Sequence, residues 1–134
     1  MSGVRIMGEL IRGSAPIVEI VPLAMIKAWK LPSGATVPSV LLTRVSRAKK
    51  QFLTAQAVWL VTERVQATVR AANGEQREQI LGLIERAGSD KIGTIAGFAN
   101  VAVLSAGGGP DFNDDAASIF MGSHDFLVSF NEPA

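Results

Sequence analysis

The chain contains no cysteine and has a single histidine, His124. The lack of cysteine excludes disulfides, thiol catalysis and cysteine-based metal sites, and it is typical of proteins from a reducing compartment. No apolar run is long enough to cross a bilayer, because Glu19, Pro22 and Lys27 interrupt the most apolar stretch, residues 16–29. We therefore expect no membrane among the partners of this protein.

The sequence also lacks the residue patterns that catalysis requires. His124 stands beside Asp125 in an expected strand, where adjacent side chains point to opposite faces of a sheet. No G-x-S-x-G motif is present that would place a nucleophilic serine on a sharp turn. We interpret His124 as a structural residue and expect the protein not to be an enzyme.

Two loop motifs fail where their geometry is most demanding. Residues 111–115 have acidic or amide side chains at the first, third and fifth positions of a calcium loop, but Ala116 and Gly122 replace the Gly and Glu it needs. The glycine stretch 107–109 lacks the Lys and Ser or Thr of a phosphate-binding loop, so we interpret it as a flexible hinge. We expect neither a metal nor a cofactor.

The length and composition describe one small, apolar domain. The chain has 134 residues, which corresponds to a single domain spanning residues 1–134. Its apolar fraction is 48% and its mean hydropathy is +0.28. This apolar excess has two interpretations, a surface covered by another protein or a well-filled core.

Charge is distributed unevenly along the sequence. Residues 1–70 contain ten Lys and Arg but three acidic residues, whereas residues 71–134 contain three Lys and Arg but nine acidic residues. Halves of opposite sign indicate contact with nucleic acid or self-complementary stacking of copies. If folding interleaves the two halves in space, the asymmetry has no such meaning.

The stretch 57–87 is the clearest structural signal. The odd positions from Trp59 to Ala71 are apolar except for Glu63, and the even positions from Thr62 to Arg70 are polar. This alternation is typical of a half-buried strand. After Asn73, which can cap a helix together with Gln76, apolar residues recur with helical spacing. These apolar positions are Ile80, Leu83, Ile84 and Ala87, with Gly88 expected to close the helix.

The other expected elements are short helices near the N-terminus and further strands. The fold class is therefore α+β, a mostly antiparallel sheet with helices packed on one face. The strand before residues 46–51 and the strand that begins near Trp59 should form a hairpin, with the basic segment 46–51 as their connection. The expected helices cover residues 2–13 and 17–21, the expected strands cover 25–31, 39–47, 98–105 and 119–130, and residues 106–115 form an irregular polar loop.

Two segments are candidates for contact with partners. The connection 44–51 carries the strongest local cluster of positive charge, and the loop 107–115 carries negative charge. Both join expected strands, so we expect both to project from the ends of the sheet, and loops of this length are typically functional or disordered. The predicted partner-binding residues are Arg44, Arg47, Lys49, Lys50, Gln51, Asp111, Asp114 and Asp115. Trp29 and Trp59 are interpreted as core or interface anchors.

The order of these motifs resembles that of the tail terminator, or tail completion, proteins of long-tailed phages and gene transfer particles. An N-terminal helix is followed by Leu31-Pro32 and Val37-Pro38 leading into a strand, and then by Arg64-Val65-Gln66 at the centre of the long strand. The helix after Asn73, a strand, a polar loop and the closing strand through residues 125–130 complete the order. The resemblance covers nearly the whole chain and lies in the order of the motifs.

This resemblance implies a structural role with no covalent chemistry. Proteins of this family form rings, usually hexameric, that cap the finished tail tube, stop its polymerisation and present a surface for joining the head. The implied partners are further copies of this chain, the tail tube protein and a head–tail connector or stopper protein, with DNA passing through the ring. The implied location is the head-proximal end of the tail in the virion, after assembly in the host cytoplasm.

Two other kinds of protein fit the same sequence. A neck or head-closure connector protein is the first alternative, since it would share the structural features of a terminator. A small nucleic-acid-binding domain is the second, because Arg44, Arg47, Lys49 and Lys50 could bind phosphates, although no aromatic stacking motif accompanies them.

Overall fold

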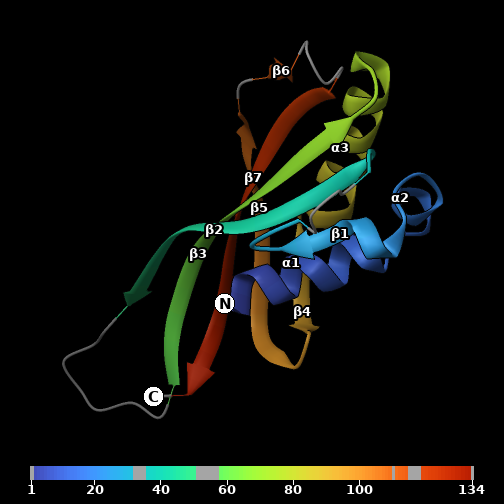
Figure 1. Cartoon of the computed structure of the whole chain (residues 1–134). Helices are drawn as coiled ribbons and strands as arrows, with labels where there is room; N and C mark the ends of the chain where they lie inside the picture. The colour runs from blue at the N-terminus through green and yellow to red at the C-terminus, as the bar shows by residue number, and fades with distance from the viewer. Residues whose placement is uncertain (1, 32–35, 51–57, 110, 115–118, 134) are drawn as a thin grey trace.

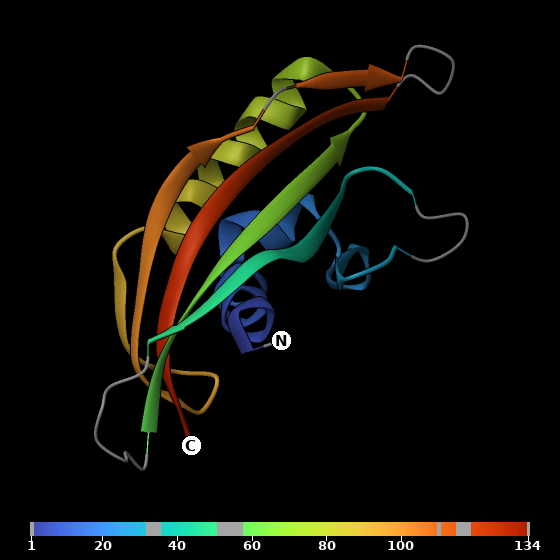
Figure 2. The same ribbon diagram turned by 90° about the vertical axis from the view of Figure 1, so that its left-hand side faces the viewer.

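The structure is a computed structural model that describes residues 2–31, 36–50, 58–109, 111–114 and 119–133. One long sheet forms its frame, and the helices lie against one face of it (Figures 1 and 2). The predicted α+β class and the mostly antiparallel sheet are therefore confirmed. Within the described residues, no helix has the length and apolar character needed to cross a membrane.

The strand order of the sheet is β1-β2-β3-β7-β5-β4, and β6 pairs with β7 beyond the end of β5. Only β1 and β2 run parallel; every other pair is antiparallel. The strands are β1 (Ile26–Ala28), β2 (Ser39–Lys50), β3 (Val58–Ala71), β4 (Lys91–Ile95), β5 (Phe98–Gly108), β6 (Phe112–Asp114) and β7 (Ile119–Pro133). The helices are α1 (Ser2–Arg12), α2 (Ala15–Ile20), the 3-10 turn η1 (Leu23–Met25) and α3 (Gly74–Gly88).

β3 and α3 form as the alternation and helical spacing predict. The odd positions of β3 from Val61 to Ala71 face the helices and are fully buried, and they include the charged Glu63. At the start of α3 the Asn73 side chain accepts a hydrogen bond from the Gln76 amide at 2.8 Å. The Gln76 side chain in turn accepts one from the Ala72 amide at 2.9 Å, so two backbone donors at the helix start are satisfied.

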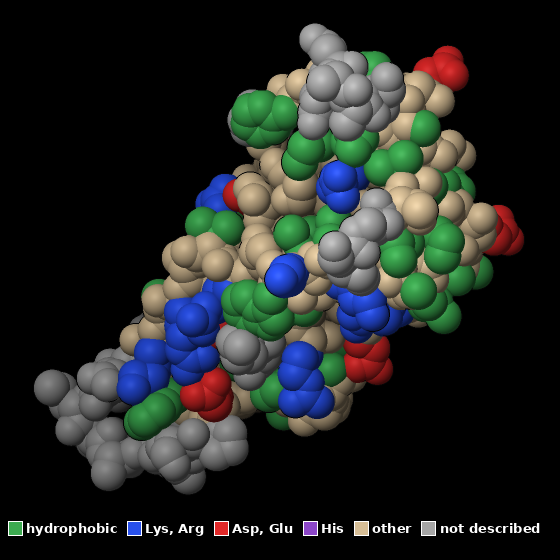
Figure 3. Space-filling model, viewed as in Figure 1, with side chains coloured by type: hydrophobic (Ala, Val, Ile, Leu, Met, Phe, Trp, Pro, Cys, Tyr) green, Lys and Arg blue, Asp and Glu red, His purple; other side chains and the backbone are tan. Residues whose placement is uncertain are grey.

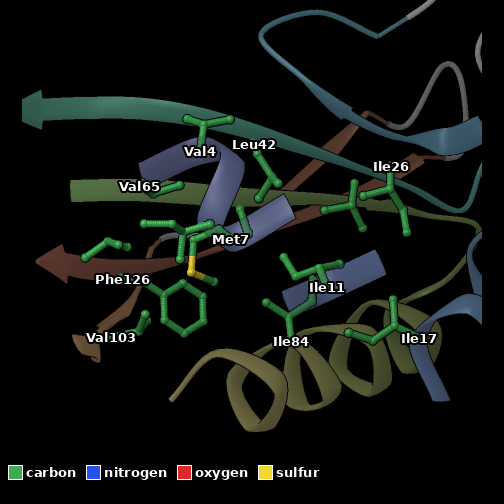
Figure 4. Close-up of a cluster of buried hydrophobic side chains, with 14 of the residues drawn as sticks. Val4, Met7, Ile11, Ile17, Ile26, Leu42, Val65, Ile84, Val103 and Phe126 are labelled. Atoms are coloured by element: carbon green, nitrogen blue, oxygen red, sulfur yellow. The ribbon is translucent and has the colours of Figure 1, made fainter. Parts of the chain in front are cut away.

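The core lies between the sheet and the helices α1 and α3 (Figure 4). Phe126 of β7 is among its largest fully buried side chains, and Met7 of α1 and Ile84 of α3 belong to the same cluster. Gly88 permits this packing, since a Cβ atom there would lie 2.6 Å from the Phe126 ring and 2.8 Å from the Met7 methyl group. The expected helix end shifts by one residue: Gly88 is the last residue of α3, and Ser89 is its C-cap.

The structure corrects several of the expected elements. β2 continues to Lys50, so most of the expected basic connection is strand. The segment 106–115 is not irregular throughout, because β5 runs to Gly108 and β6 pairs with β7. β4 was not predicted, because four of its five residues are exposed and Gly93 interrupts any apolar pattern.

Alanine variants of neighbouring residues on α3 test the orientation of this helix. Ile84 is fully buried, whereas Leu83 is only partly buried. We expect Ile84→Ala to lower the free energy of unfolding by about 2–5 kcal/mol and Leu83→Ala to lower it by about 1 kcal/mol, because part of the Leu83 side chain remains in water. Urea unfolding monitored by circular dichroism measures both values, and a larger loss for Leu83→Ala would contradict this orientation.

Candidate functional site

The positively charged surface lies on the second half of β2. Arg44 pairs with Val65, and a β-bulge between Arg44 and Ser46 shifts the register, so that Arg47 then pairs with Glu63 and Lys49 with Val61. The extra residue brings Arg44, Arg47 and Lys49 to the same face of the sheet, the face on which the helices lie. Lys and Arg side chains gather there over the end of β2 (Figure 3, lower left).

The buried Glu63 is a counter-ion beneath this positively charged surface. Its carboxylate is fully buried and accepts hydrogen bonds from Arg47 Nη1 at 2.8 Å and from the Gly3 backbone amide at 3.0 Å. Arg44 Nη1 lies 3.8 Å from the same carboxylate. The one break in the alternation of β3 is therefore an anchor that joins the sheet to the first turn of α1.

Arg47 connects Glu63 with the surface. Its second terminal nitrogen donates to Glu132 Oε1 at 2.8 Å. The hydrogen bonds from Arg47 to Glu132 and to Glu63 raise the pKa of the Arg47 guanidinium above its ordinary value. Lys49 takes a different partner, with Nζ 3.4 Å from the centre of the Trp59 ring. Arg44, Arg47 and Lys49 thus have acidic or aromatic partners within the same chain, and all three remain accessible to solvent.

The predicted acidic residues lie at the other end of the molecule. Asp111 precedes β6, and its carboxylate is 3.4 Å from Arg77 Nη2 of α3. Arg77 also donates to Asn113 at 3.3 Å, which fixes this segment on α3. Asp114 ends β6, and its side chain lies outside the described part of the chain. Figure 1 shows β6 and the end of β2 at opposite ends of the sheet, so the two groups cannot meet within one subunit.

Three further predicted residues are only partly placed, or not placed, by the structure. Lys50 is the last residue of β2, but its side chain lies outside the described part of the chain. Gln51 and Asp115 lie wholly outside it.

Part of the glycine stretch 107–109 is strand, and Gly109 packs closely against β7. Gly107 and Gly108 belong to β5, and the Gly109 amide donates to the Ser123 carbonyl at 2.9 Å. A Cβ atom at Gly109 would overlap the Ser123 hydroxyl. Glycine is required here by the close approach to β7.

His124 has a structural environment. Its Nε2 lies 2.7 Å from the Ser105 hydroxyl, its side chain is 8% exposed, and its ring is tilted against Phe126 with centres 4.9 Å apart. The neighbouring Asp125 points to the other face, where it accepts a hydrogen bond from Arg64 at 2.8 Å. The expected separation of His124 and Asp125 is confirmed, and these two residues do not form a Ser–His–Asp arrangement. Among the described residues no group of three or more His, Asp or Glu side chains could hold a metal ion.

Comparison with known proteins gives a fold match and no sequence match. Neither a protein-family model nor a curated protein sequence matches this chain. Among solved structures, the chain is similar to one from the virion of a native gene transfer agent particle, with a TM-score of 0.70 and 8% sequence identity. The similarity covers 96% of this chain and 94% of the other, so the two share a fold over nearly their full lengths.

Proposed function

We propose that this protein is a structural component of a phage-like or gene transfer particle, in which it forms a ring that caps the tail tube. The observation that carries the proposal is the fold shared over 96% of the chain with a component of such a virion. The order of motifs along the sequence supports the same role independently of that match. The partners of the ring would be the tail tube protein and a head–tail connector or stopper protein, at the head-proximal end of the tail.

The distribution of charge suits a ring of identical subunits. The basic end of β2 and the acidic segment around Asp111 and β6 occupy opposite ends of one subunit. Contacts between unlike surfaces of identical copies generate rings when the rotation closes. Exposed ion pairs are each worth only about 0–1 kcal/mol, so these charges would set the orientation of subunits more than their affinity.

A ring of six copies on the particle is the expected result of direct imaging. Electron microscopy of purified particles should show these subunits as a closed ring at the head-proximal end of the tail tube. Particles made without this protein should have tails of irregular length that do not join heads. Subunits that are not joined in a ring would refute the proposal, and a ring located within the neck would instead support the head-closure alternative.

Charge reversal on β2 tests the proposed contact surface. We expect Lys49→Glu combined with Lys50→Glu to weaken tail completion, because the reversed charges repel an acidic neighbour. The fold should persist, since Lys49 is exposed and its contact with Trp59 is worth about 0.5–1 kcal/mol. The measurement is the length of tails and the fraction joined to heads in a complementation assay.

Lys91→Glu on β4 is the matched control, because this exposed lysine lies on a different strand. The reversal of Asp114 and Asp115 to Lys tests the acidic surface in the same assay. Normal tails that still join heads with both double variants would show that these residues are not contacts. If DNA passing through the ring contacts the basic residues, the Lys49/Lys50 variant should also lower DNA retention.

A further inference from the structure

A pocket lies on the face of the sheet opposite the helices. Thr68 of β3 pairs with Ser123 of β7 on this face, because the alternate residues Ala67 and Val69 point into the core. Phe112 of β6 pairs with Met121 of β7 and forms a wall. The pocket has a volume of about 310 Å³ and is lined by Gln66, Thr68, Phe112, Met121, Gly122 and Ser123.

The hydroxyl groups in this pocket form no hydrogen bond with the described residues. Six residues away along β3, an equivalent cross-strand pair, Thr62 and Ser129, is joined by a hydrogen bond of 2.9 Å. The Thr68 and Ser123 side chains make no such bond to each other or to any other described residue. The Thr68 and Ser123 oxygens are not among the fully buried atoms that lack a partner, so a group that enters the pocket can reach them.

The walls of the pocket define the chemistry of that group. Phe112 is 59% exposed, and with Met121 it offers a polarizable apolar surface that suits an aromatic ring. None of the lining residues is charged, so an ion entering the pocket would lose hydration without a counter-charge. The pocket thus fits a neutral aromatic group with one hydrogen-bonding atom, and its volume, at the small end of ligand sites, fits one large side chain.

Trp29 is such a group, and it is held in an unusual position. It follows β1 at the edge of the sheet, and its side chain is 45% exposed. Its φ of 71° lies in the left-handed region, which is strained for a bulky residue. Hydrogen bonds from the Trp29 amide to the Leu42 carbonyl at 2.9 Å and from the Lys30 amide to the Ala28 carbonyl at 2.8 Å hold this conformation. The ring held in this conformation is not part of the core of its own chain.

We propose that Trp29 of one copy inserts into the pocket lined by Thr68, Phe112 and Ser123 on the next copy. The indole ring packs against Phe112 and Met121, and its N–H group donates to the hydroxyls or to Gln66. The inference rests on the proposed function, because it supplies a contact between subunits of the ring. Trp29 and the pocket lie on different surfaces of the subunit, so each copy can bind one neighbour on each side, as a ring requires.

Photo-crosslinking tests where residue 29 binds. The full chain is prepared with p-benzoylphenylalanine in place of Trp29, concentrated and irradiated, and crosslinked dimers are mapped by mass spectrometry. We expect intermolecular adducts on the strand β7 segment that contains Met121 and Ser123. The matched control carries the same crosslinker in place of Leu23, which is 53% exposed but has no assigned pocket. Adducts that map elsewhere, or no intermolecular adducts, would overturn the inference.

Complementary variants test the pairing of unlike surfaces. Trp29→Ala removes the inserted side chain and Thr68→Trp fills the pocket, so each variant alone should stay monomeric. An equimolar mixture should form 1:1 dimers in analytical ultracentrifugation, because one variant keeps the pocket and the other keeps Trp29. Thr68→Val with Ser123→Ala should weaken association about fivefold to tenfold through lost hydrogen bonds. Thr62→Val, which alters the equivalent pair outside the pocket, should leave association unchanged.

The outcomes for the pocket and for the proposed function are separable. Rings that form normally on particles with Trp29→Ala would refute the pairing and leave the ring intact. Particles that carry no ring of the unaltered protein would refute the proposed function itself.

Discussion

Replacement of Phe126 by alanine should lower the free energy of unfolding by about 3–5 kcal/mol. The Phe126 ring is fully buried at the point where α1, α3 and the sheet meet. The close approach of α3 at Gly88 leaves the helix fitted to this ring, so the surrounding residues cannot collapse easily into the space that alanine would leave. The loss therefore includes a cavity term in addition to the lost transfer free energy.

Phe112 provides the matched control for this experiment. It is the same residue type on the same sheet, but it is 59% exposed on the opposite face. Phe112→Ala should change the free energy of unfolding by about 0.5 kcal/mol or less. Chemical denaturation of the two variants measures the difference, and similar losses would contradict the burial described for Phe126.

Replacement of Arg47 by alanine should lower the free energy of unfolding by about 3 kcal/mol. The variant removes the guanidinium that lies 2.8 Å from the buried carboxylate of Glu63, and breaking a buried ion pair on one side costs about 3–5 kcal/mol. Arg44, at 3.8 Å, and the Gly3 amide still face the carboxylate, which places the expected loss at the lower end of this range. The loss should be measured by denaturant unfolding at neutral pH.

Glu132 is the exposed partner of Arg47 in this network and provides the matched control for Glu63. It binds the same guanidinium at the same distance of 2.8 Å, but its side chain is 27% exposed. Glu132→Ala should therefore cost about 1 kcal/mol or less. The double variant Glu63→Leu/Arg47→Leu should lose less than Arg47→Ala, because no unpaired charge stays buried. A loss for Glu132→Ala equal to that for Arg47→Ala would contradict the role assigned to Glu63.

Local sequence pattern predicted the elements that bury one continuous face. The alternation through β3 and the helical spacing of Ile80 and Ile84 are strong signals, because each repeats over several residues and ends at a recognisable cap. β2 was predicted too short because its second half lacks an apolar repeat. The β-bulge at Arg44 shifts the alternation there, and the charged residues that follow face Glu63 where an apolar residue would be expected.

The candidate contact sites depended on information that local pattern does not contain. The predicted clusters around Lys49 and Asp111 are placed at opposite ends of the sheet by the register of the strands, which sequence spacing does not reveal. The pocket combines residues of β3, β6 and β7, which the pairing of Thr68 with Ser123 and of Phe112 with Met121 brings together. The signal that pointed toward a contact was Trp29, interpreted as a core or interface anchor, although its strained φ was not foreseeable.

The central position of β7 has a consequence for the synthesis of this protein. β1, β2 and β3 form one part of the sheet and β4 and β5 form another, and β7 alone joins the two parts. It also follows all the other strands in the chain, so both parts leave the ribosome before the strand that connects them. Until β7 arrives, the open edges of β3 and β5 are free to pair with other nascent chains. We expect chaperones that bind exposed strand edges to act during this interval.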